Sequence, residues 1–285
     1  RRLRNLLRSN DHLRCQPSYS LEEIGKGFAN TQRVRRLAGA HFYNYHLRKA
    51  RFCGLFLSQW CYTFYIKQYS QATMKPKRII LIRHGESEGN VDLRQYGKTP
   101  DFSLNLTQRG IEQAQNAGIK IKEIIGSEKI SVYISPFFRT RQTFKALKGS
   151  IEENITRAIE DPRIREQEWG HLRHPEENKE IKDERDDYST FYFRIPDGES
   201  GADVYDRVST FLETLHRDFR KPNFPDNALI VTHGMTLRLF LMKWFHWSVE
   251  EFENVRNPKN CQIVVMEKQE DRKYKLGSEL KTRKP

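Results

Sequence analysis

The chain of 285 residues carries 50 Lys and Arg against 37 Asp and Glu, and 37% of its residues are hydrophobic. Most of the formal net charge of +13 comes from residues 1–73, which hold 13 basic and three acidic residues, whereas the remainder holds 37 and 34. Because the basic excess belongs to one segment, it is a weak indication of a nucleic-acid-binding domain, and we expect no nucleic-acid partner.

The basic leader, residues 1–73, contains no methionine, and the first methionine of the chain is Met74. We expect translation to begin at Met74, which would make the leader an artefact of untranslated sequence. The alternatives are a targeting segment, since the leader is rich in arginine and poor in acidic residues, and an interaction tail. Its apolar stretch, residues 52–66, is short for a membrane span, so we expect no stable span.

Residues 74–285 are long enough for one domain with a core of ordinary size. Of the four cysteines only Cys261 lies in this part, so a disulfide framework is excluded there and a reducing compartment is favoured. We expect a cytoplasmic protein, or a mitochondrial one if the leader is a genuine targeting segment.

Two short apolar runs, residues 79–82 and 228–231, predict buried strands. A histidine follows each of them closely: His84 comes after Arg83, and His233 comes after Thr232. In open parallel sheets, ligands bind beyond the carboxyl ends of the strands. The two histidines are therefore expected to meet in one site.

The other predicted elements alternate between strand and helix. Helices are expected from the N-cap Thr107 to residue 125, over residues 202–219 and around residues 236–245, because apolar residues recur there at helical spacing. Further strands are expected at residues 130–134 and 261–266, the latter including Cys261. This alternation predicts an α/β fold, a three-layer α/β/α sandwich with a largely parallel sheet.

Five short motifs follow one another along the domain. They are residues 83–90 (Arg-His-Gly-Glu-Ser-Glu-Gly-Asn), 106–114, 135–143 (Ser-Pro-Phe-Phe-Arg-Thr-Arg-Gln-Thr), 165–170 and 198–200. In this order they resemble the histidine phosphatase superfamily, whose best-known members are the cofactor-dependent phosphoglycerate mutases. The resemblance covers roughly residues 77–268 and implies a phosphoglycerate-mutase-like fold and a histidine phosphatase domain at 74–285. Residues 198–208 and 240–252 are most similar to the phosphoglycerate-mutase-like proteins of fungi and plants, which are closer to phosphatases than to glycolytic mutases.

The residue types themselves indicate phosphoryl transfer. A neutral imidazole is a competent nucleophile toward phosphorus at pH 7, which makes His84 the candidate nucleophile. The transferred group spreads its charge over three oxygens and needs fixed cationic donors, and Arg83 and Arg139 each offer a bidentate fork. Arg141 is equally available by composition, and the family pattern Ser-Pro-x-x-Arg favours Arg139.

The remaining pocket residues are implied by the resemblance. It implies that His233 donates a hydrogen bond to the phosphoryl oxygens beside His84. Asn90, Thr107 and Gly234 match positions that bind substrate in the family, although Thr107 is also the expected helix N-cap.

A carboxyl group must protonate the leaving alkoxide and then accept a proton from the attacking water. Glu166 is the candidate because it stands four residues before Gly170, as in the family's Glu-x-x-x-Gly block, and Glu168 is its nearby competitor. A histidine nucleophile with arginine clamps needs no metal, and we expect no cofactor. We interpret His171 and His174 as part of a solvated loop, since the rest of a zinc-binding pattern is missing.

A lid over the pocket is expected between Gly170 and Gly198. Its residues 174–187 hold seven acidic and three basic side chains, whereas a mutase lid should be rich in cations. Residues 191–193, all aromatic, with Arg194 would form an apolar wall carrying one positive charge, which favours a phosphate ester with an organic body. Alternatively, these aromatic residues pack the lid onto the domain.

We therefore expect a metal-independent phosphatase that hydrolyses phosphomonoesters through a phosphohistidine on His84. Its partner would be a small phosphorylated substrate or, alternatively, a phosphoprotein. A phosphoglycerate mutase and a weakly active phospholigand-binding protein are the other hypotheses. The mutase would depend on a bisphosphate primer, and the binding protein would show neither activity.

Overall fold

The computed structural model describes residues 76–170, 174–278 and 280–282, so the predictions for the leader lie outside the described residues. Six strands form one sheet in the order β3-β2-β4-β1-β5-β6. They are β1 (Arg78–Arg83), β2 (Ile130–Ile134), β3 (Ile155–Glu160), β4 (Asn227–Thr232), β5 (Ile263–Lys268) and β6 (Tyr274–Leu276). The first four strands in this order are parallel, β5 pairs antiparallel with β1 at one edge, and β6 pairs antiparallel with β5.

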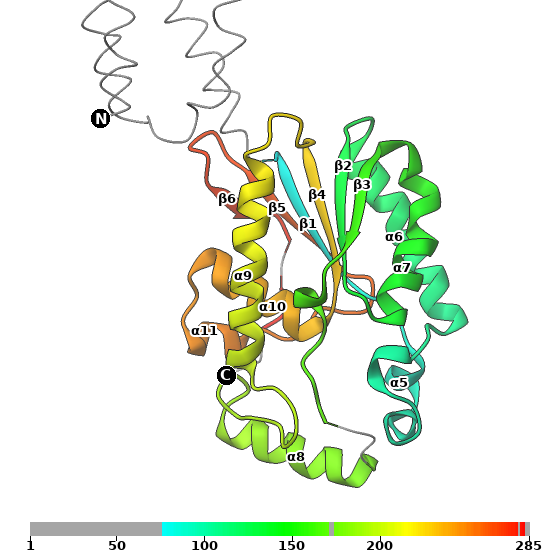
Figure 1. Cartoon of the computed structure of the whole chain (residues 1–285), viewed down its shortest axis with the longest axis vertical. Helices are drawn as coiled ribbons and strands as arrows, with labels where there is room; N and C mark the ends of the chain where they lie inside the picture. Colours follow the sequence, from blue (N-terminus) through cyan, green and yellow to red (C-terminus); the bar gives the residue numbers. More distant parts are fainter. Residues whose placement is uncertain (1–75, 171–173, 279, 283–285) are drawn as a thin grey trace, which may run out of the picture. The chain divides into compact units, whose positions relative to one another are not determined.

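Helices cover both faces of this sheet (Figure 1). The helices are α5 (Glu88–Val91), α6 (Gln108–Ile125), α7 (Phe138–Ile151), α8 (Pro175–Tyr188), α9 (Gly201–Phe219), α10 (Gly234–Phe245) and α11 (Val249–Asn254), with the 3-10 turns η1 (Leu93–Gly97), η2 (Asp101–Ser103), η3 (Glu152–Asn154) and η4 (Pro162–Ile164). Helices α6 and α7 lie on one face, and α9 and α10 lie on the other (Figure 1). The predicted three-layer fold with a largely parallel sheet is confirmed.

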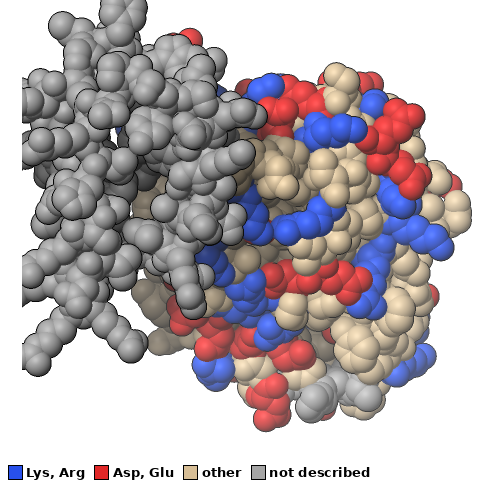
Figure 2. Space-filling view, turned by 45° about the horizontal axis from the view of Figure 1, so that its top comes forward, with Lys and Arg blue, Asp and Glu red and all other residues tan. Residues whose placement is uncertain are grey.

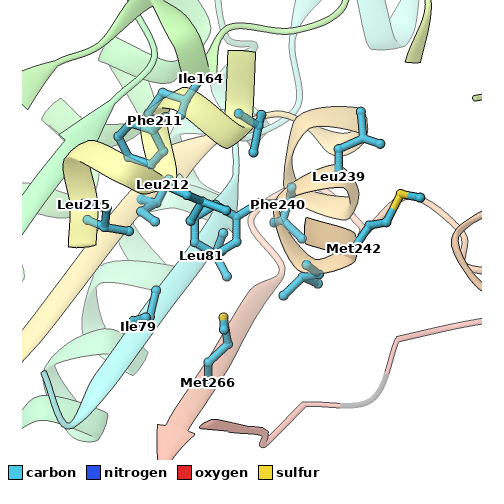
Figure 3. Close-up of a cluster of buried hydrophobic side chains, with 14 of the residues drawn as sticks. Ile79, Leu81, Ile164, Phe211, Leu212, Leu215, Leu239, Phe240, Met242 and Met266 are labelled. Atoms are coloured by element: carbon cyan, nitrogen blue, oxygen red, sulfur yellow. The ribbon is translucent and has the colours of Figure 1, made fainter. Parts of the chain in front are cut away.

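Alternation along β1 explains the three layers. Ile79 and Leu81 belong to the hydrophobic cluster under α9 and α10, whereas Ile80 and Ile82 belong to the cluster under α6 and α7. All four side chains are fully buried, as expected for a strand whose successive side chains point to opposite faces of a covered sheet. Figure 3 shows the first cluster, in which Phe211 of α9 and Phe240 of α10 pack over the strand.

The predicted helices and most strands are found at their expected places. Thr107 is the N-cap of α6, with its Oγ1 accepting a hydrogen bond from Gly110 N at 3.0 Å. The prediction for Cys261 was wrong: it is half-buried in a turn with φ of +53°, and the strand begins only at Ile263. The Cys261 N–H donates to the carbonyl of Arg83, so this turn packs against the end of β1.

Charged side chains of both signs are interspersed on the face of the described domain seen in Figure 2. This agrees with the nearly balanced composition of residues 74–285. Among the residues that the structure describes, no helix is long and apolar enough to cross a membrane.

Candidate active site

The two motif histidines meet at the carboxyl ends of β1 and β4. These strands are parallel neighbours, and Arg83 stands opposite Thr232 in their register. The His84 N–H donates to Thr232 O at 2.9 Å, and the imidazole ring centroids of His84 and His233 lie 5.2 Å apart. The expectation that the two strand ends build one site is therefore met by the geometry.

The ring of His84 is buried and held in one tautomer. Its Nδ1 lies 2.7 Å from the carbonyl oxygen of Gly85. Because a carbonyl only accepts hydrogen bonds, Nδ1 carries the proton and Nε2 keeps its lone pair. Burial, followed by the positive charges of Arg139 and Arg83, lowers the pKa of His84 well below its usual value of 6.5. The imidazole is thus neutral at pH 7, with Nε2 as the nucleophilic nitrogen.

The His84 loop is held by close backbone packing. A Cβ on Gly85 would lie 2.4 Å from the carbonyl oxygen of Gly110, and one on Gly110 would lie 2.1 Å from that of Glu86. The Gly85 N–H donates to Thr143 Oγ1 of α7 at 3.0 Å. The first turn of α6 and one side of α7 therefore fix the backbone that carries His84.

His233 is fully buried beside Ser135, whose Oγ lies 2.7 Å from its Nε2. Its ring also packs edge-on against Phe137, with the centroids 5.0 Å apart. Within the described part of the chain its Nδ1 is buried without a hydrogen-bond partner. Burial, followed by the charge of Arg139, lowers the pKa of His233 well below 6.5, so this ring is also neutral.

The two arginines border the histidines. Arg83 donates from Nη1 to Pro258 O at 2.7 Å, while its Nε is buried without a partner in the described chain. Arg139 is almost fully buried at the start of α7, and its guanidinium forms an ion pair with Asp101. Buried polar atoms without partners are rare in folded proteins, so the Nε of Arg83 is a candidate donor to a ligand.

The side chain of Glu166 lies against the N-terminus of α10, the helix that begins directly after the second histidine motif. Its Oε2 accepts from Met235 N at 3.3 Å, and its Oε1 accepts from Thr236 N at 3.3 Å and from Gln167 N at 3.1 Å. These backbone donors hold the carboxylate at the first turn of α10, which begins directly after His233. Burial lowers the pKa of Arg83, and the nearby negative charge of Glu166 acts in the opposite direction.

Its competitor Glu168 lies in a different environment. The backbone of Glu168 pairs with Glu199, through N–H to Oε2 at 3.1 Å and through its carbonyl oxygen to the Glu199 N–H at 3.0 Å. The backbone of Glu168 therefore fixes its segment to Glu199. The carboxylate that accepts hydrogen bonds from α10 belongs to Glu166.

The three residues implied as substrate-binding lie around this centre. Asn90 Oδ1 accepts from Ser87 N at 3.2 Å and from Asn260 Nδ2 at 3.0 Å. Thr107 Oγ1 donates to a carboxylate oxygen of Glu86 at 3.0 Å while it caps α6. Gly234 is the first residue of α10, where a Cβ would lie 2.9 Å from the side chain of Asn257.

A sequence profile for the histidine phosphatase superfamily (branch 1) matches residues 79–278, which include every one of these site residues. This chain is a member of that superfamily. Over 215 residues it is 44% identical to the phosphoglycerate mutase-like protein AT74 of Arabidopsis thaliana, a match that covers 71% of this chain and 68% of that protein. It is 30% identical to the broad-range acid phosphatase DET1 of Saccharomyces cerevisiae, with 68% of this chain and 86% of that protein covered.

Solved structures show the same fold at lower sequence identity. A mycobacterial glucosyl-3-phosphoglycerate phosphatase in complex with VO3 superimposes with a TM-score of 0.57 at 19% identity, over 72% of this chain and 99% of that chain. A putative alpha-ribazole-5'-P phosphatase from Escherichia coli gives a TM-score of 0.55 at 21% identity, over 73% of this chain and 97% of that chain. The fold of this histidine phosphatase family member is thus phosphoglycerate-mutase-like.

Sequence reasoning missed Arg207 of α9, which anchors the loop that carries Glu166. Its Nη1 donates to the carbonyls of Arg163 and Arg165, and its Nη2 donates to that of Glu166 at 3.0 Å. Glu199 accepts from Arg207 Nε at 3.0 Å and from Nη2 at 2.9 Å. The only feature of the sequence that could have indicated Arg207 was its position beside the apolar stripe of the predicted helix.

Tyr96 of η1 was also missed. The end of its ring lies against Gly89, where a Cβ would be 2.6 Å from Tyr96 Cζ. Burial, more than the neighbouring charges of Asp101 and Glu166, raises the pKa of Tyr96 to about 12, so its phenol stays neutral and protonated at pH 7. No motif marked this tyrosine, because its place depends on the path of the loop between α5 and α6.

The aromatic residues predicted to form an apolar wall differ in exposure: Phe191 is buried, whereas Tyr192 is exposed. Phe191 is buried and packs against Phe252, with ring centroids 5.9 Å apart, so it holds the segment onto the domain. Arg194 is exposed and donates to Asp203 Oδ1 at 2.7 Å. The alternative interpretation, in which aromatic residues pack the lid onto the domain, therefore holds for Phe191, and the apolar wall stays a prediction for Tyr192 and Phe193.

The segment predicted to form a lid contains helix α8, whose acidic residues face outward. Its residues 176, 177, 180, 183, 184, 186 and 187 are acidic, and all seven are exposed. The acidic composition therefore does not decide between a phosphatase and a mutase. No group of three or more His, Cys, Asp or Glu side chains suited to a metal ion occurs among the described residues.

Proposed function

We propose that this protein is a phosphatase that hydrolyses phosphomonoesters through a phosphohistidine intermediate on His84. The observation that carries the proposal is the state of His84: a neutral ring, with Nδ1 held by Gly85 O and the Nε2 lone pair available, beside two arginines. A positioned nucleophile with fixed cationic donors is what stepwise phosphoryl transfer requires. The acid phosphatase DET1, which is 30% identical, supports hydrolysis over isomerisation.

In the first step, His84 Nε2 attacks phosphorus, a nitrogen–phosphorus bond forms and the ester oxygen–phosphorus bond breaks. The leaving alkoxide takes a proton from Glu166. Arg83, through its unpartnered Nε, and Arg139 donate to the phosphoryl oxygens as their charge develops. These donors are fixed before substrate arrives, so little reorganisation is needed.

His233 supplies a further hydrogen bond in this scheme. In this scheme the Ser135 hydroxyl donates to His233 Nε2, which is compatible with its Oγ accepting from Phe137 N at 3.5 Å. The proton of the neutral His233 ring then resides on Nδ1, the buried atom that has no partner in the described chain. That N–H donates to a phosphoryl oxygen beside His84.

In the second step, a water molecule attacks the phosphohistidine and gives its proton to the Glu166 carboxylate. The bond between His84 Nε2 and phosphorus breaks, and inorganic phosphate leaves. Glu166 thereby regains the proton that it gave up in the first step. Charge on the phosphoryl group is balanced by protein donors throughout, so we expect the activity to be independent of metal ions. The substrate remains a phosphomonoester whose organic part is still to be identified.

The test is phosphate release by the full chain from a panel of phosphomonoesters, including 3-phosphoglycerate, in the presence of a chelator. We expect release to survive chelation, and brief incubation with labelled substrate to give an acid-labile phosphoenzyme. His84→Ala should lower release by at least about a thousandfold and remove the label. His174→Ala, an exposed histidine at the start of α8, is the matched control and should change release less than twofold.

Other results would assign a different activity. Conversion of 3-phosphoglycerate to 2-phosphoglycerate that requires a bisphosphate primer, without release of phosphate, would identify a mutase. Silence in both assays together with binding of inorganic phosphate would identify a phospholigand-binding protein.

A further inference from the structure

The arginine assigned to the phosphoryl group is already held by a carboxylate. Arg139 Nη1 donates to Asp101 Oδ1 at 2.8 Å and to the Asp101 carbonyl oxygen at 2.5 Å, and Arg139 Nη2 donates to Asp101 Oδ2 at 3.1 Å. The side chain of Arg139 is 4% exposed and that of Asp101 is 23% exposed. This pair is therefore largely shielded from water, unlike an ordinary surface ion pair.

The geometry of this pair leaves one edge of Arg139 for a ligand. A guanidinium has five N–H donors, and Asp101 takes both of Nη1 and one of Nη2. The two that remain, on Nε and Nη2, lie side by side on the other edge. Two parallel N–H groups form the fork that matches two phosphate oxygens. Asp101 and a phosphoryl group can thus bind Arg139 at the same time, on different edges.

The helix that carries Arg139 also fixes the segment that carries Asp101. One turn along α7, Gln142 accepts from Leu106 N at 2.7 Å and donates to Asn105 Oδ1 at 2.9 Å. Leu104 between these contacts is fully buried. The backbone that follows Asp101 is therefore hydrogen-bonded to α7, the helix that carries Arg139. The relative positions of Asp101 and Arg139 are fixed by these contacts.

We propose that Asp101 is a positioning residue of the phosphoryl site, which fixes the guanidinium of Arg139 so that its free edge meets the transferred group. The proposal rests on the proposed phosphatase function. Without the Asp101 carboxylate, Arg139 would keep its charge and its hydrogen bond to the backbone carbonyl of residue 101, but would lose the two side-chain hydrogen bonds that set its orientation. A displacement of about 1 Å in a group that contacts the transition state costs up to about a hundredfold in rate.

The test compares Asp101→Ala and Asp101→Asn with wild type in the full chain, with p-nitrophenyl phosphate as substrate. We expect Asp101→Ala to lower kcat by about tenfold to thirtyfold and to change KM less than about threefold, because Arg139 acts mainly in the transition state. Asp101→Asn keeps one acceptor oxygen and should lose less. Affinity for orthovanadate, measured by calorimetry, should fall in parallel with kcat.

A double-mutant cycle separates positioning from a general structural role. In an Arg139→Ala background, Asp101→Ala should lower kcat by less than about twofold, since the residue that it positions is gone. Glu160→Ala is the matched control. Glu160 of β3 forms two hydrogen bonds with Arg141, which lies on α7 like Arg139. We expect the removal of the Glu160 carboxylate to leave kcat within twofold.

Three results would overturn the proposal. One is an equal loss from Asp101→Ala in both backgrounds, which would mean a structural role. Another is faster turnover with tighter vanadate binding in Asp101→Ala, which would mean that Asp101 competes with phosphate. The third is an Asp101→Ala variant with unchanged kcat and vanadate affinity. If wild type releases no phosphate, the proposed function fails, while the vanadate measurements still decide the role of Asp101.

Discussion

Two regions of the molecule differ in burial and hydrogen bonding: the residues around the two histidines, which we call the floor of the site, and helix α8. The floor consists of His84 and His233 at the ends of β1 and β4, Ser135 at the end of β2 and Thr143 of α7; all four are buried, and each has a hydrogen-bonded neighbour on another element. Helix α8, at the bottom of Figure 1, has no buried residue. The floor is thus preorganised before substrate binds, whereas α8 is free to vary, and substitutions in the two regions should differ greatly in effect.

Helix α7 offers a strong contrast between two arginines two residues apart. Arg139→Ala should lower kcat by about a hundredfold, because it removes a fixed cationic donor from the transition state. Arg141 is exposed and paired with Glu160, so Arg141→Ala should lower kcat less than about threefold. Steady-state kinetics of both variants on one phosphomonoester measures the difference. A loss below tenfold for Arg139→Ala would show that another cation binds the phosphoryl group.

The anchor of Glu166 should matter both for stability and for activity. Arg207→Ala leaves Glu199 with one arginine fewer in a buried position, and we expect the free energy of unfolding to fall by about 3 kcal/mol. The carboxylate of Glu166 would also lose its fixed place, which should lower kcat by about tenfold.

Urea unfolding and kinetics measure both effects of Arg207→Ala. Arg194→Ala is the control, because its ion pair with Asp203 is exposed, and it should cost less than about 1 kcal/mol. A fully active Arg207→Ala variant would mean that Glu166 is positioned by α10 alone.

The two buried histidines predict how stability depends on pH. Their pKa values are lowered in the folded state, so below pH 6.5 the unfolded chain binds protons that the folded chain does not. The free energy of unfolding should therefore decrease as pH falls from about 6.5, by up to about 1.4 kcal/mol per pH unit for each histidine. Urea titrations between pH 7 and 5 should show a shallower decrease for His84→Gln than for wild type. Parallel curves would contradict the burial of a neutral His84.

Helix α8 should give the smallest effects. Glu180→Gln and Asp183→Asn remove exposed charges, so we expect kcat to change less than twofold and the free energy of unfolding to change by about 0.5 kcal/mol or less. Kinetics on two substrates of different size checks this. A large change in KM for only one substrate would show that the outer face of α8 selects substrates.

Much of the floor could be predicted from the sequence, because its two histidines closely follow the apolar runs that form the strands. The apolar runs before His84 and His233 predicted the neighbouring strands, and Thr107 predicted the cap of α6. Short motifs were sufficient because each residue lies at the end of a regular element.

The rest depended on contacts between distant segments. Asp101 reaches Arg139 across 38 positions, and Arg207 reaches the Glu166 carbonyl across 41. No periodicity encodes such pairs. Strand β3 was not predicted, because its side chains are alternately exposed and only half-buried. Phe191 was expected to face the pocket, because the sequence does not show which way an apolar side chain of this segment points.

The contact between Gly85 and Gly110 has a consequence for how this family can diversify. Because each glycine lies against backbone of the other segment, neither position accepts a side chain without moving the nucleophile. The intervening residues face no such restriction from this contact, since its two ends are fixed independently of the length between them. Residues 92–103 can therefore change without moving the nucleophile through this contact, whereas a change at Tyr96 or Asp101 would alter what packs against Gly89 and what holds Arg139.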